Sequence, residues 1–166
     1  MPESTLRVAV ICTGNICRSP MAEVLLSHLV ASDADLNGHV IVTSAGTANW
    51  HVGEEMDPRA RAALDRAGLL GEGSPAAYAD HAYLDAQDLI IVMTGEHLVD
   101  VRERLRGETE VRTWRSFHES PSTLDVVDPF YGGPAEFDAC LATLRAAGPR
   151  LTSELRQRLG ARWDEV

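Results

Sequence analysis

The residues best suited to chemistry lie in one short segment near the start of the chain, residues 12–19, which read CTGNICRS. Where such a loop joins a strand to a helix, its backbone amides can surround one tetrahedral anion, and the helix N-terminus adds partial positive charge. Gly14 would allow the backbone conformations that so tight a loop requires. The planar guanidinium of Arg18 can bind two oxygens of the same anion. The segment therefore predicts a site for a phosphate-like group.

Cys12 opens this loop, and its sulfur should therefore point toward the bound anion. The loop amides and Arg18 would stabilise the thiolate, which is the reactive form of cysteine and a nucleophile directed at phosphorus. The Gly-Lys-Ser/Thr ending of a nucleotide-binding P-loop is missing, and Cys12 and Cys17 lack the Cys-x-x-Cys spacing of dithiol redox proteins. A buried structural cysteine beside an ordinary turn is the simpler alternative, but it leaves Arg18 and Ser19 unexplained.

The elements that must position this loop alternate between strands and helices. Apolar runs rich in β-branched residues predict strands at residues 6–11, 40–43, 89–93 and 111–114. Capping residues and helical apolar spacing predict helices that begin at Ser19-Pro20, Asp57-Pro58, Thr94 and Pro134, the last interrupted at Gly148-Pro149. Such alternation indicates parallel pairing with helices on both faces. We expect one α/β domain over residues 1–166, with a four-stranded parallel sheet in the flavodoxin-like order 2-1-3-4 and a ligand site after the first strand.

The composition is that of a globular and strongly acidic protein. Its 166 residues include 25 acidic and 15 basic side chains, every basic one an arginine, for a net charge of −10. An acidic surface repels polyanions, and so we expect no nucleic-acid partner and no anionic-membrane partner. The three cysteines are too few for a disulfide framework and too scattered for a structural zinc site. Since no signal-peptide core or membrane-length apolar run is evident, we expect a cytoplasmic protein, with secretion without a signal peptide as the alternative.

Residues 10–20, VICTGNICRSP, closely resemble the signature of the low-molecular-weight protein tyrosine phosphatases of bacterial type. The resemblance continues, in the family's order, through SAGT at residues 44–47, DPRA at 57–60 and DPFY at 128–131. It implies a phosphoric monoester hydrolase that acts on phosphotyrosine through a phosphocysteine intermediate, without a metal or other cofactor. Its implied partners are phosphotyrosine proteins or peptides, among them those of a bacterial tyrosine kinase.

The resemblance also assigns roles to individual residues. Cys12 would be the nucleophile, Arg18 would bind phosphate with the loop amides, and Asp128 would be the general acid and base. From the sequence alone, Asp125 is an equal candidate for that acid. The other residues expected to touch the substrate are Thr13, Gly14, Asn15, Ile16, Cys17 and Ser19 in the loop and Trp50, Phe130 and Tyr131 as aromatic walls.

Further residues would support or tune the loop. By resemblance, Ser44 and His81 would hold it rigid through hydrogen bonds with Asn15, and Cys17 could form a reversible disulfide with Cys12. Ile16 favours phosphotyrosine, because related phosphatases of phosphoarginine carry threonine at that position. Ser19 would cap the helix, donate a hydrogen bond to the nucleophilic sulfur, or do both.

Two other functions fit parts of the pattern. An arsenate reductase of the same fold is one, but thioredoxin-coupled members use additional cysteines near the third strand, and residues 75–95 contain none. A module that binds phosphate or phosphopeptides without turnover is the other, but such a module needs neither a nucleophile nor an acid. The acidic charge further predicts weaker selection of acidic phosphopeptides, with Glu54 and Glu55 near the mouth of the cleft.

Overall fold

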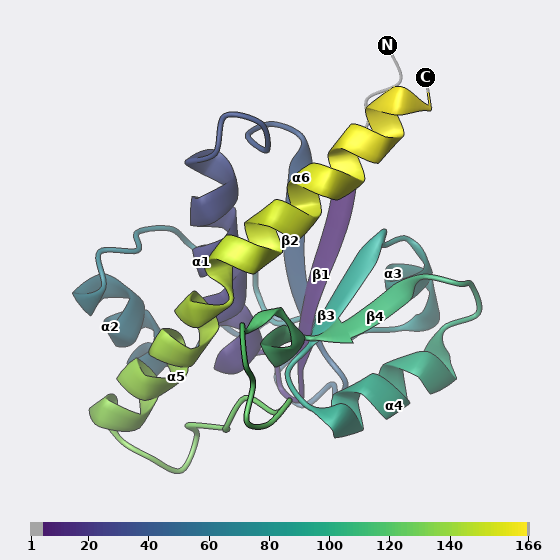
Figure 1. The fold of residues 1–166 in the computed structure, drawn as a ribbon. Coiled ribbons are helices and arrows are strands. Elements are labelled where there is room, and N and C mark those ends of the chain that lie inside the picture. Colours follow the sequence, from purple (N-terminus) through teal and green to yellow (C-terminus); the bar gives the residue numbers. More distant parts are fainter. Residues whose placement is uncertain (1–4, 166) are drawn as a thin grey trace.

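The structure is a computed structural model that describes residues 5–165. Its sheet has four parallel strands in the order β2-β1-β3-β4, as Figure 1 shows, and the predicted fold class is confirmed. The strands are β1 (Leu6–Cys12), β2 (Val40–Gly46), β3 (Leu89–Val92) and β4 (Glu110–Thr113). β2 runs three residues beyond its predicted end at Thr43 because it stays paired with β1 up to Cys12.

Helices connect and follow the strands. They are α1 (Arg18–Ala31), α2 (Pro58–Arg66), α3 (His81–Asp85), α4 (Gly95–Arg104), α5 (Pro134–Ala146) and α6 (Gly148–Asp164), with a 3-10 turn, η1 (Trp114–Phe117). The predicted interruption at Gly148-Pro149 is confirmed, since α5 and α6 meet there. The sequence pattern did not predict α3 and η1, which are too short to show a helical apolar period.

Side chains of β1 alternate between two apolar clusters, one on each face of the sheet. Val8 and Val10 join the larger cluster with residues of α1, α5 and α6. Ala9 and Ile11 join the smaller one, which includes Val101 of α4. Figure 1 shows α1, α5 and α6 on one side of the sheet and α3 and α4 on the other, so the prediction of helices on both faces is confirmed.

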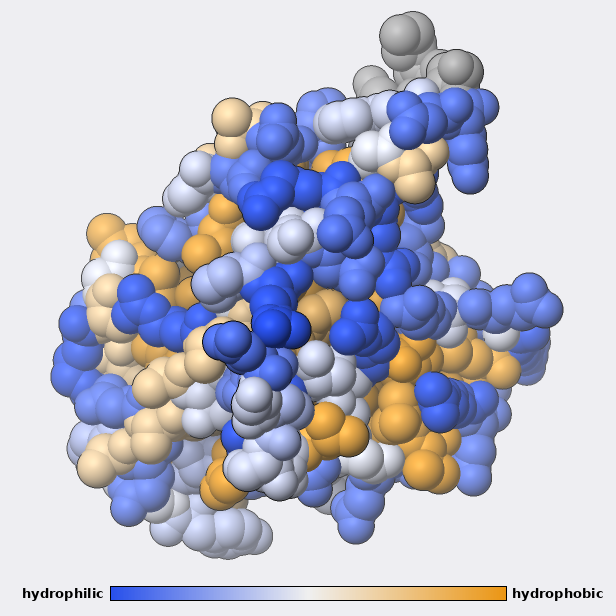
Figure 2. All heavy atoms as spheres, viewed as in Figure 1, coloured by the Kyte–Doolittle hydropathy of each residue, from blue (hydrophilic) through white to orange (hydrophobic). Residues whose placement is uncertain are grey.

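The outer surface of α6 illustrates how the helices cover this core. Leu151, Leu155 and Leu159 are fully buried beneath the helix, whereas the side of α6 that faces the viewer in Figure 2 is mostly hydrophilic. Among residues 5–165, no helix is long and apolar enough to cross a membrane.

The carboxyl ends of β1, β2 and β3 lie side by side, because the strands are parallel and in register. The chain leaves β1 through α1, on the face of the larger cluster, and leaves the neighbouring strand β3 through α4, on the face of the smaller cluster. In open α/β sheets, a crevice opens between adjacent strands whose connections take opposite faces. The loop that follows Cys12 begins at this point.

Candidate active site

The loop from Cys12 to Arg18 joins the end of β1 to the start of α1. Cys12 is 3% exposed, and its Sγ lies 3.0 Å from Ser19 Oγ. The residue with left-handed backbone is Asn15, with a φ of 60°, and not Gly14 as the sequence suggested. Asparagine tolerates this conformation better than most residues.

Backbone amides just after β2 support the loop from behind. Thr47 N donates to Cys12 O at 2.9 Å, and Ala48 N donates to Thr13 O at 3.0 Å. Between them, Gly46 approaches so closely that a Cβ there would stand 2.4 Å from Thr13 O. No other residue type fits this position without moving the loop, and the close approach holds the start of the loop against the end of β2.

A chain of hydrogen bonds runs beneath the loop. Asn15 Nδ2 donates to Ser19 Oγ at 2.8 Å and to Ser44 Oγ at 2.9 Å. Asn15 Oδ1 accepts from Ala77 N at 2.9 Å, which fixes the orientation of the side-chain amide. Ser19 Oγ therefore accepts from Asn15 and keeps its own hydrogen for the sulfur of Cys12. Ser19 was expected to cap α1, but the helix begins at Arg18 with no side-chain cap.

Glu23 closes this network, and the sequence pattern missed it. Its carboxylate is 6% exposed and accepts from Ser44 Oγ at 2.5 Å and from Ser74 N and Oγ at 3.1 and 2.9 Å. The supporting role expected of His81 is wrong, because His81 is exposed and its Nδ1 contacts Arg104 O at 2.5 Å. For Glu23, the one signal in the sequence is that an acidic residue lies within the apolar face of the first helix.

Arg18 connects the loop to the segment that carries Asp128. The Arg18 side chain is almost fully buried, and its Nη1 donates to Val126 O at 3.0 Å. Its Nη2 lies 3.4 Å from Asp128 Oδ2, and the Asp128 side chain is 45% exposed. Asp125, the alternative acid, instead accepts from Gly95 N at 2.8 Å. Geometry therefore favours Asp128 over Asp125 as the carboxyl group that faces a bound anion.

Arg59 anchors the far side of the Asp128 segment from α2. Its guanidinium pairs with Asp57 at 2.8 Å, and Nη1 also donates to Phe130 O at 2.8 Å and to Gly132 O at 3.0 Å. The hydrogen bond from Arg59 holds the pKa of Asp57 below its usual value. Arg59 lies within the DPRA segment, but the sequence pattern alone predicts no role for it.

These segments enclose a cleft above the sheet. It is lined by Cys12, Thr13, Gly14, Ile16, Cys17, Arg18, Trp50, His51, Asp128, Phe130 and Tyr131. Of the residues expected to touch the substrate, Asn15 and Ser19 do not line the cleft and lie beneath the loop. His51 is an addition that the sequence analysis missed; its Nδ1 contacts Glu54 Oε2 at 2.6 Å. Among residues 5–165, no group of three or more His, Cys, Asp or Glu side chains is arranged to hold a metal ion.

The aromatic walls stand at the mouth of this cleft. Trp50 and Tyr131 are 72% and 94% exposed, so most of their surface is free to contact a ligand. Phe130 packs edge-on against Tyr131, with ring centroids 5.1 Å apart. The cleft therefore offers a polar base and aromatic sides.

The family model described as low molecular weight phosphotyrosine protein phosphatase matches residues 7–161. The chain belongs to this family. A low molecular weight protein-tyrosine-phosphatase of Streptomyces coelicolor is 38% identical over 163 residues, which cover 95% of this chain and 98% of that relative. The low molecular weight protein-tyrosine phosphatase A of Mycobacterium tuberculosis is 39% identical and covers 93% of this chain and 94% of its own. The crystal structure of YfkJ from Bacillus subtilis superposes with a TM-score of 0.82 at 29% identity, covering 95% of this chain and 98% of the other.

The predicted resemblance and the predicted class of enzyme, a low-molecular-weight protein-tyrosine phosphatase, are thus confirmed. In this phosphatase the other two cysteines differ from Cys12 in their surroundings. Burial and the neighbouring Asp57 raise the pKa of the Cys17 thiol, whose Sγ lies 4.0 Å from Asp57 Oδ2. Burial raises the pKa of Cys140 to about 12. Both are therefore held as neutral thiols, whereas Cys12 has a serine hydroxyl directed at its sulfur.

Proposed function

We propose that this phosphatase hydrolyses phosphotyrosine through a phosphocysteine intermediate formed on Cys12. The observation that carries the proposal is the grouping of Cys12, Arg18 and Asp128 around one cleft, with Ser19 Oγ 3.0 Å from the sulfur. Arg18 and the loop amides would hold the three equatorial oxygens, which carry the charge of the transition state.

In the first step, the Cys12 thiolate attacks phosphorus in line with the leaving oxygen. The sulfur–phosphorus bond forms as the bond from phosphorus to the tyrosine oxygen breaks, and Asp128 gives its proton to that oxygen. A bound phosphate also competes for Arg18, which lies 3.4 Å from the Asp128 carboxylate in the free enzyme. This exchange would release the Asp128 carboxylate from Arg18, so that it can bind the proton that it then donates to the leaving group.

In the second step, water replaces tyrosine. Asp128, now ionised, removes a proton from the water as its oxygen attacks phosphorus, and the sulfur–phosphorus bond breaks. Inorganic phosphate leaves and the Cys12 thiolate is restored. The hydroxyl of Ser19 would assist by donating to the sulfur as its negative charge returns.

The shape of the cleft supports a phosphoaryl substrate. Trp50, Phe130 and Tyr131 offer faces on which a flat ring can stack, and a phosphate on a short side chain would reach the base with less contact to these walls. Ile16 adds an apolar side chain to the lining, which favours phosphotyrosine over phosphoarginine. We propose proteins phosphorylated by a bacterial tyrosine kinase as the substrates, and a cytoplasmic location that would keep the three cysteines unpaired.

Turnover of p-nitrophenyl phosphate and of phosphotyrosine peptides tests this proposal. Cys12→Ser should lower kcat to background while still binding phosphotyrosine peptide, because the cleft remains but the nucleophile is lost. Cys140→Ala, which removes a buried cysteine outside the cleft, is the matched control and should retain activity. Acid quenching of the wild type during turnover should trap phosphate on Cys12. Substantial activity in Cys12→Ser would contradict the nucleophile, and faster turnover of phosphoserine or phosphoarginine peptides would contradict the substrate.

A further inference from the structure

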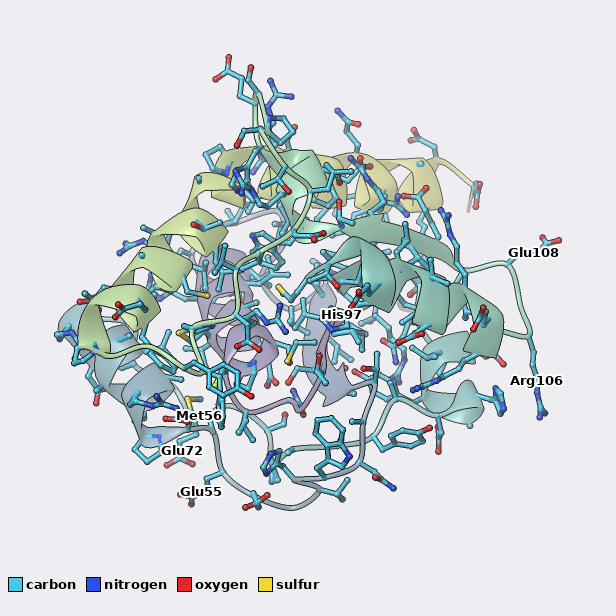
Figure 3. The ribbon with its side chains drawn as sticks, turned by 90° about the horizontal axis from the view of Figure 1, so that it is seen from below. Glu55, Met56, Glu72, His97, Arg106 and Glu108 are labelled. Carbon is cyan, nitrogen blue, oxygen red and sulfur yellow. The ribbon has the colours of Figure 1, made fainter. Side chains whose placement is uncertain are left out.

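His97 is a buried imidazole that the proposed reaction does not use. It is 4% exposed and extends from the first turn of α4 toward the centre of the molecule, as Figure 3 shows. Its Nε2 lies 2.8 Å from Oγ1 of Thr13, the residue that follows the nucleophile. No sequence pattern predicts a role for His97.

The ring of His97 is neutral, and its hydrogen bonding is incomplete. Burial and the nearby Arg18 guanidinium lower the pKa of His97 to about 4, against the opposing effect of Asp100, Asp125 and Asp128. Nδ1 is buried without a hydrogen-bond partner among residues 5–165. A neutral imidazole has one N–H. If Nε2 carries the hydrogen and donates it to Thr13, only the lone pair of Nδ1 lacks a partner. In the other tautomer, Nδ1 would carry a buried N–H without an acceptor, which is the costlier arrangement.

The same turn of α4 also holds the segment that carries the general acid. Gly95 N donates to Asp125 Oδ1 at 2.8 Å. Just before the turn, Met93 O accepts from Val126 N at 2.8 Å. Asp128 follows two residues after Val126. The start of α4 therefore contacts both the loop of the nucleophile and the segment of the acid.

We propose that His97 is a positioning residue that donates to Thr13 Oγ1 and thereby sets the nucleophile loop relative to Asp128. This inference rests on the proposed function. An apolar side chain of similar size would fill the space without an unpaired nitrogen, so packing alone does not account for a histidine here. A misplacement of about 1 Å between reacting groups can lower a rate by roughly 100-fold.

A double-mutant cycle on Thr13 and His97 tests the coupling, with kcat measured on p-nitrophenyl phosphate and on phenyl phosphate. Thr13→Val and His97→Leu should each lower kcat by roughly 10- to 100-fold, and the double variant should be no slower than the slower single variant. The loss should be larger on phenyl phosphate, whose leaving group depends more on the acid. His97→Gln keeps an N–H donor and should recover most of the activity.

The control is His118→Gln, since His118 contacts Thr143 O at 2.8 Å outside the cleft and its replacement should leave kcat unchanged. Multiplicative losses in the double variant, or equal losses on the two substrates, would overturn the proposal. If His97→Leu does not fold, the Thr13→Val variant is sufficient as a test, because a wild-type kcat in that variant would overturn the proposal. Activity that survives Cys12→Ser would contradict the proposed function instead, so the two failures are distinguishable.

Discussion

The hydroxyl of Ser19 shows how the network directs single hydrogen atoms. A carboxylate can only accept, and so Glu23 obliges Ser44 Oγ to donate to it. Ser44 then accepts from Asn15, whose amide donates to Ser19 as well. The hydrogen of Ser19 is left for the sulfur of Cys12. A buried carboxylate at the far end of the network thus fixes the direction of the hydrogen bond that Cys12, the proposed nucleophile, receives.

Asp128 can be tested through the basicity of the leaving group. Asp128→Ala should lower kcat on phenyl phosphate by roughly 100- to 10,000-fold, because a basic phenolate then departs without a proton. The loss should be much smaller on p-nitrophenyl phosphate, whose anion is stable. Initial rates on a series of aryl phosphates measure how steeply kcat falls as the leaving phenolate becomes more basic, and this dependence is the slope to compare. Asp138→Ala on the surface of α5 is the control and should keep the wild-type slope; an unchanged slope in Asp128→Ala would remove Asp128 from the role.

At this scale the sequence predicted most residues of the cleft, although not His51, and the contact between Asn15 and Ser44 beneath the loop. Cys12, Arg18 and Asp128 belong to segments whose spacing or family resemblance marks them. Glu23 and His97 gain their roles only from the packing of α1 and α4 against the loop, over separations along the chain that no local pattern encodes. The wrong assignment of His81 has the same origin, since distance to the loop cannot be read from a single sequence.

At the scale of elements, the strands and most helices were predictable because continuous apolar strands and amphipathic helices have distinct periods. The ends of the elements were less predictable. β2 continues to Gly46, which stays paired with Cys12 at the end of β1. α1 starts before Ser19, whose hydroxyl contacts the sulfur of Cys12 and does not cap the helix. Both deviations occur at the active site, where function competes with local preference.

The contact between α2 and the Asp128 segment is an element-level feature that can be tested. Arg59→Met removes the donors to Phe130 O and Gly132 O and leaves Asp57 without its partner. Because the anchor at Val126 stays, we expect a moderate loss of roughly 10-fold in kcat, larger on phenyl phosphate than on p-nitrophenyl phosphate. Arg59→Lys should be intermediate, since an ammonium cannot reproduce the planar fork.

Arg66→Met is the matched control for this variant. Arg66 lies on the same helix and binds Asp138 on the surface, away from the cleft, so its replacement should leave both rates unchanged. Equal activity of Arg59→Met and the wild type on phenyl phosphate would show that the Asp128 segment keeps its position without Arg59.

At the scale of the whole molecule, a net charge of −10 is compatible with a phosphate site because the guanidinium of Arg18 is enclosed within the protein. Arg18 is only 5% exposed, whereas Glu54, Glu55 and Glu72 are exposed. Glu54 contacts His51 in the cleft lining. Glu55 and Glu72 line a neighbouring groove and point outward at the same edge in Figure 3. A ligand therefore meets a negative outer field before it reaches a positive base.

This arrangement predicts that phosphotyrosine peptides with acidic flanks are poorer substrates than those with basic flanks. The difference should lie in kcat/KM and shrink as salt rises, since exposed charges are screened over about 10 Å at 0.1 M. Replacing Glu54, Glu55 and Glu72 with glutamine should further reduce the difference in kcat/KM between the two kinds of peptide. The same change at Asp164 and Glu165, at the C-terminal end of α6, should not, because Figure 1 shows this end of α6 far from the carboxyl ends of the strands. If acidic peptides were preferred, the entrance acids would not govern encounter, and local contacts to the aromatic walls would have to outweigh the field of the whole molecule.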